Sequence, residues 1–392
     1  MTSKIKNIMI MISRDDSFGN NLIAGIIEYS KLCGNWTLTT QLPQYLEKHQ
    51  SQYSFKGTGI DGVIAYIPNK EKADKIFFGD IPAVIAHETE ENKIHKITSI
   101  VCDHRKIGTL ASNFFKERGF HNIGFLGFEE FNWSIERQKG FENANALFGC
   151  KTKTFLLPAQ AFKPRPQNEK KIISWLKSLH YPACVLCAND DLGLYLIKTC
   201  IKAEIKVPGQ VAILGVDNNE MDCNLTTPSL SSISYNSQKA GFQAAETLDS
   251  LMLGKPALYE KIIVSPIGVI NRMSTDSFAV LDEDVIKAIN YIKINNRTLI
   301  QVDDVAHAIN ISRRNLSRKF KNTLGRSISD EIRRTKAEYI CHLLADTNTS
   351  VSEIAYRTGF NDATHISRFF KEQTGITPLE YRRNYSLKTN YY

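Results

Sequence analysis

The chain has 392 residues, of which 42% are hydrophobic and 23% charged, a composition typical of globular proteins rather than disordered ones. No stretch approaches the roughly 20 apolar residues of a membrane-spanning helix, and the apolar run at residues 8–12 is too short for a signal peptide. We therefore expect a cytoplasmic protein of two or three domains. The net charge is +8, and residues 281–392 alone hold 18 basic against 13 acidic residues, which fits a polyanion partner.

Residues 4–272 alternate short β-branched runs with stretches of helical period. The runs at 8–12, 62–66, 83–86, 122–126, 183–187 and 211–214 predict buried parallel strands. The stretches at 20–32, 105–118, 134–147, 168–179 and 191–202 predict crossover helices. This alternation predicts a doubly wound α/β fold, and the strand at 122–126 divides it into two similar lobes. Runs at 231–235 and 262–270 could return the chain to complete both sheets.

Polar and aromatic residues follow the predicted strands, at the edge where open α/β sheets bind ligands. Any one of them alone is more simply a helix cap or a loop residue. Their joint placement favours a ligand cleft, in which carboxylates, amides and Arg bond hydroxyl groups and aromatic rings cover the C–H face of a sugar. The candidate ligand-binding residues are Asp16, Phe18, Asp103, Trp133, Arg137, Asn189, Asp190 and Asp217.

Nothing in the α/β region predicts catalysis or a bound cofactor. It has no Walker-type phosphate loop, no GxSxG elbow and no HExxH pair. The sole CxxC, Cys184 and Cys187, lies in a predicted strand that points the two thiols to opposite faces, which favours buried reduced cysteines over a metal site. We expect no cofactor, no metal and no enzymatic activity.

The C-terminal part reads as helical throughout and contains a repeat. We expect a linker at residues 276–284 and a helical domain at 285–386, after an α/β domain at 1–275. Leu316, Arg318 and Phe320 recur fifty residues later as Ile366, Arg368 and Phe370. Upstream the offset is 49, so one residue is inserted between two helices of the second copy, around Gly359. Two helix-turn-helix units in tandem explain this pattern.

In each copy the apolar pair four residues apart would hold the second helix against the core. The outer face would then be free to enter the DNA major groove, where Arg suits guanine and Thr or Ala suits the thymine methyl. A small bundle with a solvated basic face is the simpler alternative, but two copies in register favour DNA binding. The candidate DNA-binding residues are Arg313, Arg314, Ser317, Arg318, Lys321, Ala363, Thr364, His365, Ser367, Arg368 and Lys371.

Residues 298–383 resemble the DNA-binding domain of the AraC/XylS family of transcriptional regulators, and the stretch SEIAYRTGFNDATHISRFFKEQTGITPLEYRR carries the likeness. The resemblance implies two recognition helices in successive major grooves, joined by a rigid helix at residues 328–345. It also implies which positions face bases: Arg314, Ser317, Arg318, Ala363, Thr364, Ser367 and Arg368.

The α/β region resembles the core of LacI/GalR regulators in residues 103–108, 117–127, 188–190 and 215–218. We do not expect that family's N-terminal helix-turn-helix here. The resemblance implies that Asp103, Arg137, Asn189 and Asp217 line an effector cleft. This domain order is similar to that of the xylose operon regulator family. It implies an activator that binds double-stranded DNA as a homodimer, responds to D-xylose, and has RNA polymerase as a further candidate partner.

Three alternatives remain at this point. The effector could be another sugar, the α/β domain could serve only for dimerisation, or a sugar-processing enzyme could be fused to a DNA-binding domain.

Overall fold

The computed structural model describes residues 5–14, 16–40, 53–54, 57–67, 76–77, 80–87, 97–158, 166–276 and 282–385. The chain forms two compact units. We call residues 1–114 and 122–276 the α/β unit, and residues 115–121 and 277–392 the helical unit. Residues 277–281 of the predicted linker lie outside the described residues. Among the described helices, none is both long and apolar enough to span a membrane.

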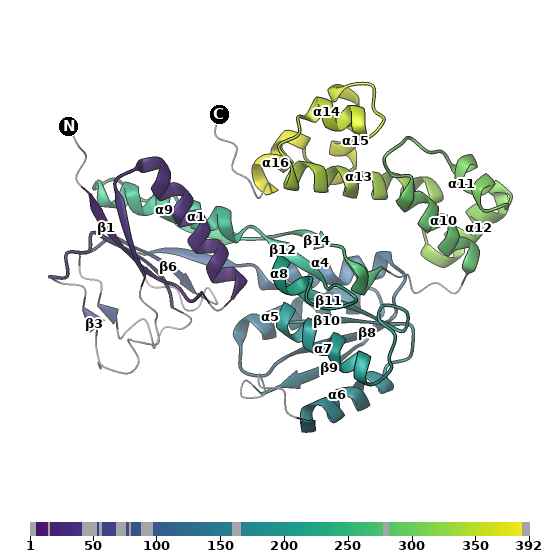
Figure 1. The fold of residues 1–392 in the computed structure, drawn as a ribbon, viewed down its shortest axis with the longest axis horizontal. Coiled ribbons are helices and arrows are strands. Elements are labelled where there is room, and N and C mark those ends of the chain that lie inside the picture. The colour runs from purple at the N-terminus through teal and green to yellow at the C-terminus, as the bar shows by residue number, and fades with distance from the viewer. Residues whose placement is uncertain are drawn as a thin grey trace. The chain divides into compact units, whose positions relative to one another are not determined.

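The first sheet of the α/β unit is parallel throughout, in the order β13-β7-β6-β4-β1-β2. Two helices, α1 (Ser17–Cys33) and α9 (Ser237–Met252), lie side by side against it (Figure 1). A separate two-stranded pair joins β3 (Tyr53–Ser54) to β5 (Ile76–Phe77). The six strands of the sheet are β1 (Lys6–Met11), β2 (Trp36–Thr40), β4 (Gly62–Tyr66), β6 (Ala83–His87), β7 (Thr98–Cys102) and β13 (Lys261–Val264).

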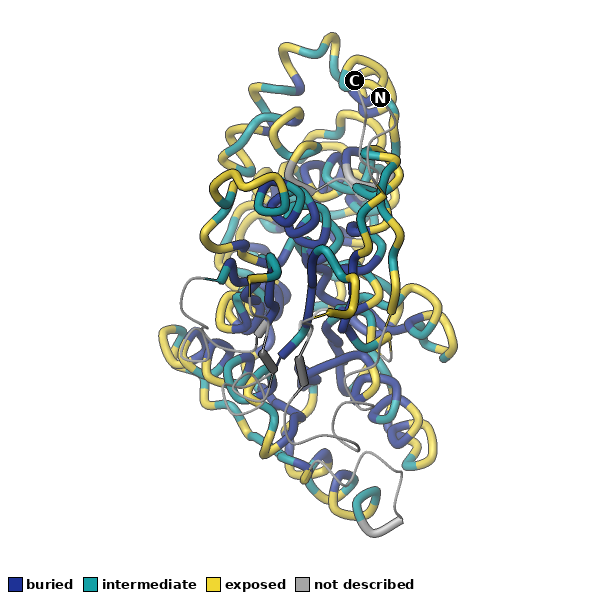
Figure 2. Tube along the Cα trace, turned by 90° about the vertical axis from the view of Figure 1, so that its left-hand side faces the viewer, coloured by how far each residue is buried: buried dark blue, intermediate teal, exposed yellow. Residues whose placement is uncertain are grey.

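The second sheet has the order β14-β12-β11-β10-β8-β9, with only β14 antiparallel to its neighbour. Its strands are β8 (Asn122–Phe128), β9 (Thr152–Leu157), β10 (Ala183–Cys187), β11 (Val211–Val216), β12 (Ser231–Tyr235) and β14 (Pro266–Ile270). The accompanying helices are α4 (His104–Glu117), α5 (Asn132–Leu147), α6 (Pro166–Ser178), α7 (Asp190–Lys202) and α8 (Glu220–Cys223), and a 3-10 turn spans Met273–Thr275. The buried residues gather along the central strands (Figure 2).

The predicted doubly wound, two-lobed fold is confirmed, and the run at 262–270 does return the chain to both sheets. Several elements escaped prediction, among them β2, β9 and α9. Strands β2 and β9 are edge strands with mixed polar and half-exposed residues, so they lack the apolar run of a central strand. Helix α9 buries a face built largely of small residues, which gives a weak apolar period.

Three segments cross between the two sheets, and hydrogen bonds join them. The first crossing segment follows β7, the second follows β12, and the third connects β13 to β14. The backbone N–H of Asp103 donates to the carbonyl of Val264 at 2.9 Å, and that of Asn236 donates to Ser265 at 3.1 Å. The backbone N–H of Ser265 in turn donates to Asn236 Oδ1 at 2.7 Å. The crossings therefore form one bonded group beside the strand ends.

The helical unit contains two helix-turn-helix pairs around a shared helix, α13. The first pair is α11 (Val302–Ala308) and α12 (Arg313–Leu324), preceded by α10 (Glu283–Ile294). The second pair is α14 (Val351–Arg357) and α15 (Ala363–Thr374), followed by α16 (Pro378–Tyr385). Helix α13 (Ile328–Asp346) places Ile328 in the apolar core of the first pair, and Ile340 and Leu344 in that of the second.

The structure locates the inserted residue of the second copy. Both turns contain a left-handed residue, Asn310 with φ 56° and Gly359 with φ 82°, and these positions differ by 49. The helix caps that follow, Ser312 and Asp362, differ by 50. The additional residue is therefore Asn361, two positions after the glycine at which the sequence pattern placed it.

The contact between α1 and α9 depends on glycine. A Cβ added to Gly25 would lie 1.9 Å from the Gln238 carbonyl oxygen, and one added to Gly241 would lie 2.0 Å from that of Leu22. Both neighbours are backbone atoms, so an added methyl forces the two helices apart.

We predict that Gly25→Ala destabilises the α/β unit by about 1–3 kcal/mol, the usual cost of overpacking a core. Chemical denaturation followed by circular dichroism measures it. Gly268→Ala is the control, because a Cβ there meets nothing within 4 Å. Equal midpoints for the two variants would contradict the close helix contact.

Candidate ligand cleft and nucleic-acid interface

A pocket of about 120 Å³ opens where the two sheets of the α/β unit meet. That volume admits only a small molecule, since one water occupies about 30 Å³ in the liquid. Its walls come from the ends of β1, β4, β7, β8, β10, β11 and β12 and the helices that follow them, as expected for strands whose carboxyl ends share an edge. The lining residues are Ile12, Ser13, Asp16, Phe18, Gly19, Tyr66, Cys102, His104, Trp133, Arg137, Asn189, Asp217 and Tyr235.

A buried arginine organises the floor of this cleft. Arg137 is 4% exposed, and its guanidinium donates to Asp217 Oδ1 at 3.2 Å and to the carbonyl oxygen of Ala188. The hydroxyl of Tyr235 donates to the same Asp217 oxygen at 2.8 Å. Burial raises the pKa of Asp217 above its ordinary value, although the charge of Arg137 opposes this. Removal of either partner would leave the other charge uncompensated at a largely buried position, which is strongly destabilising.

Two buried polar atoms of the cleft find no partner within the described part of the chain. They are Arg137 Nε and His104 Nδ1. Burial, reinforced by the charge of Arg137, holds the pKa of His104 well below its usual range, so the imidazole is neutral. Unsatisfied polar atoms in a buried site call for a partner from outside the protein, and hydroxyl groups or water could supply it.

Aromatic rings form the apolar walls. The Phe18 ring lies 6.3 Å from Tyr66 and 6.0 Å from Tyr235 between centroids. Opposite the first sheet, Trp133 lies with its ring centroid 5.1 Å from the Arg137 guanidinium carbon, which fixes both side chains. The cleft thus combines rings with buried hydrogen-bonding groups, the combination that ligand pockets commonly show.

Six of the eight candidate ligand residues line this pocket: Asp16, Phe18, Trp133, Arg137, Asn189 and Asp217. The other two support it from outside the lining. Asp103 accepts a hydrogen bond from the backbone of Lys106 in the first turn of α4. Asp190 is buried and accepts from Ser232 Oγ at 2.6 Å and from the backbone N–H of Asn219 at 2.9 Å, which holds the loop after β11.

Sequence reasoning missed seven lining residues: Ile12, Ser13, Gly19, Tyr66, Cys102, His104 and Tyr235. Tyr66, Cys102 and Tyr235 are the last residues of β4, β7 and β12. These three could have been predicted from the sequence if the last residue of each strand had been considered as a candidate along with the loop residues that follow it.

The second candidate site is the outer face of α12. Ser312 caps this helix by accepting from the backbone N–H of Asn315, and Leu316 and Phe320 are fully buried beneath it. The predicted DNA-binding residues of α12 are all exposed: Arg313, Arg314, Ser317, Arg318 and Lys321. Arg313 pairs with Asp303 at 2.9 Å, and Arg318 donates to Asn315 Oδ1 at 3.0 Å, so both guanidinium groups are oriented at the helix surface.

The matching face of α15 is less basic. Asp362 caps the helix through the N–H groups of Thr364 and His365, and the His365 ring lies 3.0 Å from its carboxylate. The Ser367 hydroxyl donates to the Ala363 carbonyl at 2.6 Å. Thr364, His365, Arg368 and Lys371 are exposed, whereas Ala363 and Ser367 are half-buried.

Comparison with known proteins agrees with this architecture. Residues 112–275 match the profile of a periplasmic binding protein-like domain, and residues 305–384 that of a helix-turn-helix domain. The protein is thus a transcriptional regulator that joins a periplasmic binding protein-like sensor to a DNA-binding helix-turn-helix domain.

More particularly, the chain is a homologue of xylose operon regulatory proteins. It is 27% identical to that of Escherichia coli (strain K12) over 395 aligned positions, covering 97% of this chain and 98% of the relative. Identity with that of Haemophilus influenzae is 28% over 334 positions, covering 83% and 85%. The solved structure of a xylose-binding transcription activator, XylR, superposes with a TM-score of 0.62 at 26% identity, covering 98% of this chain and 100% of that one.

We predict that Arg137→Met destabilises the α/β unit by about 3–5 kcal/mol, because it leaves the half-buried Asp217 carboxylate without its cation. Denaturant unfolding followed by tryptophan fluorescence measures the change. Arg105→Met is the matched control, since Arg105 pairs with Glu136 on the exposed surface and its loss should leave the midpoint unchanged. Similar midpoints for both variants would show that the buried pair contributes little.

Proposed function

We propose that this regulator binds D-xylose or a closely related sugar in the cleft of its α/β unit and operator DNA through α12 and α15. It acts as a homodimeric activator in the cytoplasm, without catalysing a reaction on the sugar, and RNA polymerase is its further partner at the promoter. The sugar domain corresponds to residues 1–275, the linker to 276–284 and the DNA-binding domain to 285–386.

The observation that carries the sugar proposal is the pair of unsatisfied buried atoms, Arg137 Nε and His104 Nδ1, in a small cleft walled by aromatic rings. A sugar hydroxyl both donates and accepts hydrogen bonds, so vicinal hydroxyls could serve a guanidinium N–H and the neutral ring nitrogen together. The rings of Phe18 and Trp133 could cover the C–H face. The names of the full-length relatives, which refer to xylose, support the choice of sugar.

A regulatory signal follows if the ligand joins the two sheets. Asp16, Phe18 and Tyr66 belong to the side of the first sheet, whereas Trp133 and Asn189 belong to the second. A sugar that touches both sets binds the closed arrangement more tightly than an open one. Sugar binding therefore shifts the equilibrium toward the closed arrangement, and the difference between the two affinities alone sets the size of that shift.

Binding of the sugar is tested by thermal shift against a panel that includes D-xylose, L-arabinose, D-ribose and D-glucose. We predict that D-xylose raises the melting temperature and that Trp133→Leu weakens its affinity about fivefold, the equivalent of about 1 kcal/mol for a lost aromatic contact.

The control is Trp175→Leu, because Trp175 packs against Phe155 away from the cleft and its loss should leave the sugar affinity unchanged. If no sugar raises the melting temperature, the α/β unit has another role and dimerisation becomes the leading one. Turnover of a bound sugar, followed by chromatography, would instead favour an enzyme.

For DNA we propose unequal roles for the two recognition helices. Helix α12 presents four exposed cations on its candidate face and α15 presents two, Arg368 and Lys371, beside Thr364 and His365. The first helix should therefore contribute more of the salt-dependent affinity, and the second more hydrogen-bonded or apolar readout.

We predict that Arg318→Ala and Arg368→Ala each weaken operator binding by about 1–3 kcal/mol if the side chain reads a base. If it contacts a phosphate, affinity falls uniformly and the salt slope decreases by about one. Fluorescence anisotropy at several salt concentrations separates the two outcomes. Lys287→Ala, which removes an exposed cation of α10, is the control expected to bind normally. Normal binding by both arginine variants would rule out the proposed docking face.

A further inference from the structure

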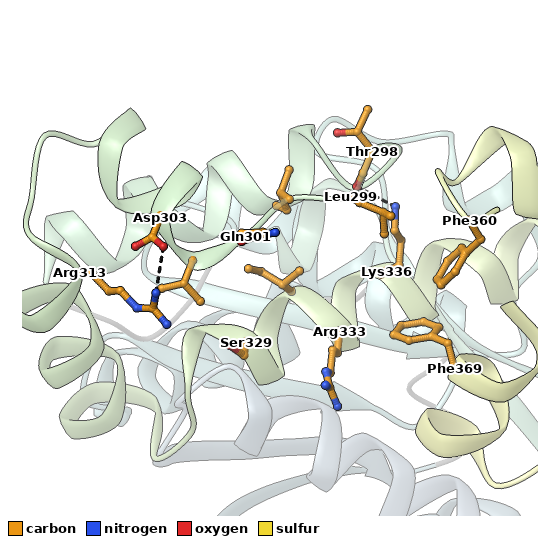
Figure 3. A pocket seen from close by; sticks show the side chains of 13 residues that line it. Thr298, Leu299, Gln301, Asp303, Arg313, Ser329, Arg333, Lys336, Phe360 and Phe369 are labelled. Carbon is orange, nitrogen blue, oxygen red and sulfur yellow. Dashed lines mark hydrogen bonds and ion pairs between the residues drawn. The ribbon is translucent and has the colours of Figure 1, made fainter. Parts of the chain in front are cut away.

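The two helix-turn-helix pairs are held to one another by more than their common helix. A cavity of about 340 Å³ lies between them, along one face of α13 (Figure 3). Residues 298–303 and Arg313 of the first pair line it, as do Phe360 and Phe369 of the second. Besides α13 itself, which packs in both cores, contacts around this cavity join the two pairs.

Lys336, in the middle of α13, makes the most extensive of these contacts. It is 4% exposed, and its Nζ donates three hydrogen bonds of 2.7, 2.8 and 2.7 Å to the carbonyl oxygens of Asn296, Thr298 and Thr358. An ammonium group has three protons, so every one is used. The Phe360 ring centroid lies 6.0 Å from the same nitrogen.

The three acceptors belong to different halves of the unit. Asn296 and Thr298 lie in the connection from α10 to α11, whereas Thr358 ends α14. One ammonium group thus bonds the entry to the first helix-turn-helix and the turn of the second. The Thr358 carbonyl is four residues before Asp362, the cap of α15, so the bond acts close to the start of that helix.

A glycine contact lies beside this lysine. Gly359 has φ 82°, and a Cβ there would lie 3.2 Å from both the Cγ and the backbone nitrogen of Leu299. The turn of the second pair therefore approaches the first pair's connection within van der Waals distance. The hydrogen bonds of Lys336 and the close approach of Gly359 to Leu299 therefore involve the same two segments, the connection before α11 and the turn after α14.

Burying this cation is unfavourable by itself. Burial lowers the pKa of Lys336 to about 8, and a buried charge is tolerated only when its protons find good acceptors. Apolar side chains would fill the position at lower cost, so the lysine is better explained by the geometry that three fixed acceptors impose.

We propose that Lys336 is a positioning residue that fixes the distance between α12 and α15, so that the protein discriminates the spacing of two half-sites in DNA. This inference rests on the proposed DNA-binding function. Helix α13 joins the two recognition helices through apolar packing in both cores, and Lys336 adds directional hydrogen bonds between the two pairs. Removal of those bonds should widen the range of separations without altering either recognition surface.

The test compares the full-length protein with Lys336→Met and Lys336→Arg. Methionine keeps the length of the side chain and removes its donors, whereas arginine keeps the charge and the donors. DNA duplexes selected by the wild type from a random pool provide the operator, and a second set carries one inserted or deleted base pair between the half-sites. A third set carries one half-site alone.

We expect the wild type to lose affinity at least tenfold with either spacing change. Lys336→Met should bind the original operator about tenfold more weakly, bind the half-site as the wild type does, and tolerate the changed spacings within about threefold. Lys336→Arg should restore most of the discrimination. If Lys336 only stabilised the fold, its loss would lower the affinity for the half-site and for the full operator together. That result would overturn the inference. Full discrimination of spacing by Lys336→Met would overturn it as well.

A measurement without DNA separates this inference from the proposed function. Spin labels are attached at the exposed positions Asn322 and Glu372, near the ends of α12 and α15, and the distance between them is measured. Cys33, Cys150 and Cys341, the free cysteines that are only partly buried, are first replaced by serine so that they are not labelled. The distance distribution should be narrow in the wild type and broad in Lys336→Met, with Lys287→Met as a control that stays narrow. Equal widths in all three would sink the positioning role. A wild type that selects no DNA sequence would sink the proposed function while leaving this distance result to be judged by itself.

Discussion

The α/β unit depends on the hydrogen bonds among the three segments that cross between its sheets. These bonds join Asp103 to Val264 and Asn236 to Ser265. Because the crossings run next to one another, residues from distant parts of the chain end at the same place. Cys102 and His104 at the first crossing and Tyr235 at the second reach the cleft for this reason. A bend at so few crossing segments is also the simplest way to let two rigid sheets close on a ligand.

The cleft's electrostatics follow from its depth. Arg137 is buried with a single carboxylate partner, Asp217, and with Tyr235 and the Ala188 carbonyl as further bonding groups. This arrangement satisfies much of the guanidinium and leaves one donor, Nε, without a partner among the described residues. The same charge disfavours protonation of His104. A neutral imidazole and an oriented guanidinium together offer an uncharged polyol a donor and an acceptor without a strong preference for an anion.

The helical unit uses one element for two cores. Helix α13 supplies Ile328 to the first apolar cluster and Ile340 and Leu344 to the second, so neither helix-turn-helix can shift far along it. Lys336 bonds carbonyl oxygens of both pairs beside the cavity, and the close approach of Gly359 to Leu299 joins the same two segments.

The sequence by itself determined the order of elements, the two-lobed α/β fold, the tandem helix-turn-helix pairs and the exposed faces of α12 and α15. Each follows from a local period, a glycine or a capping residue, and such signals need no knowledge of distant neighbours. Six cleft residues were also predictable, because parallel strands place their carboxyl ends at one edge whatever the rest of the chain does.

Only the tertiary structure decided that His104 and Tyr235 join the cleft, that Asp190 supports a loop, and that Lys336 bonds carbonyls of both helix-turn-helix pairs. The physical reason is shared by all three. Each residue's role is set by partners 18 to 42 positions away or by its burial. A sequence pattern records which side chain is present but not which atoms the fold brings to it.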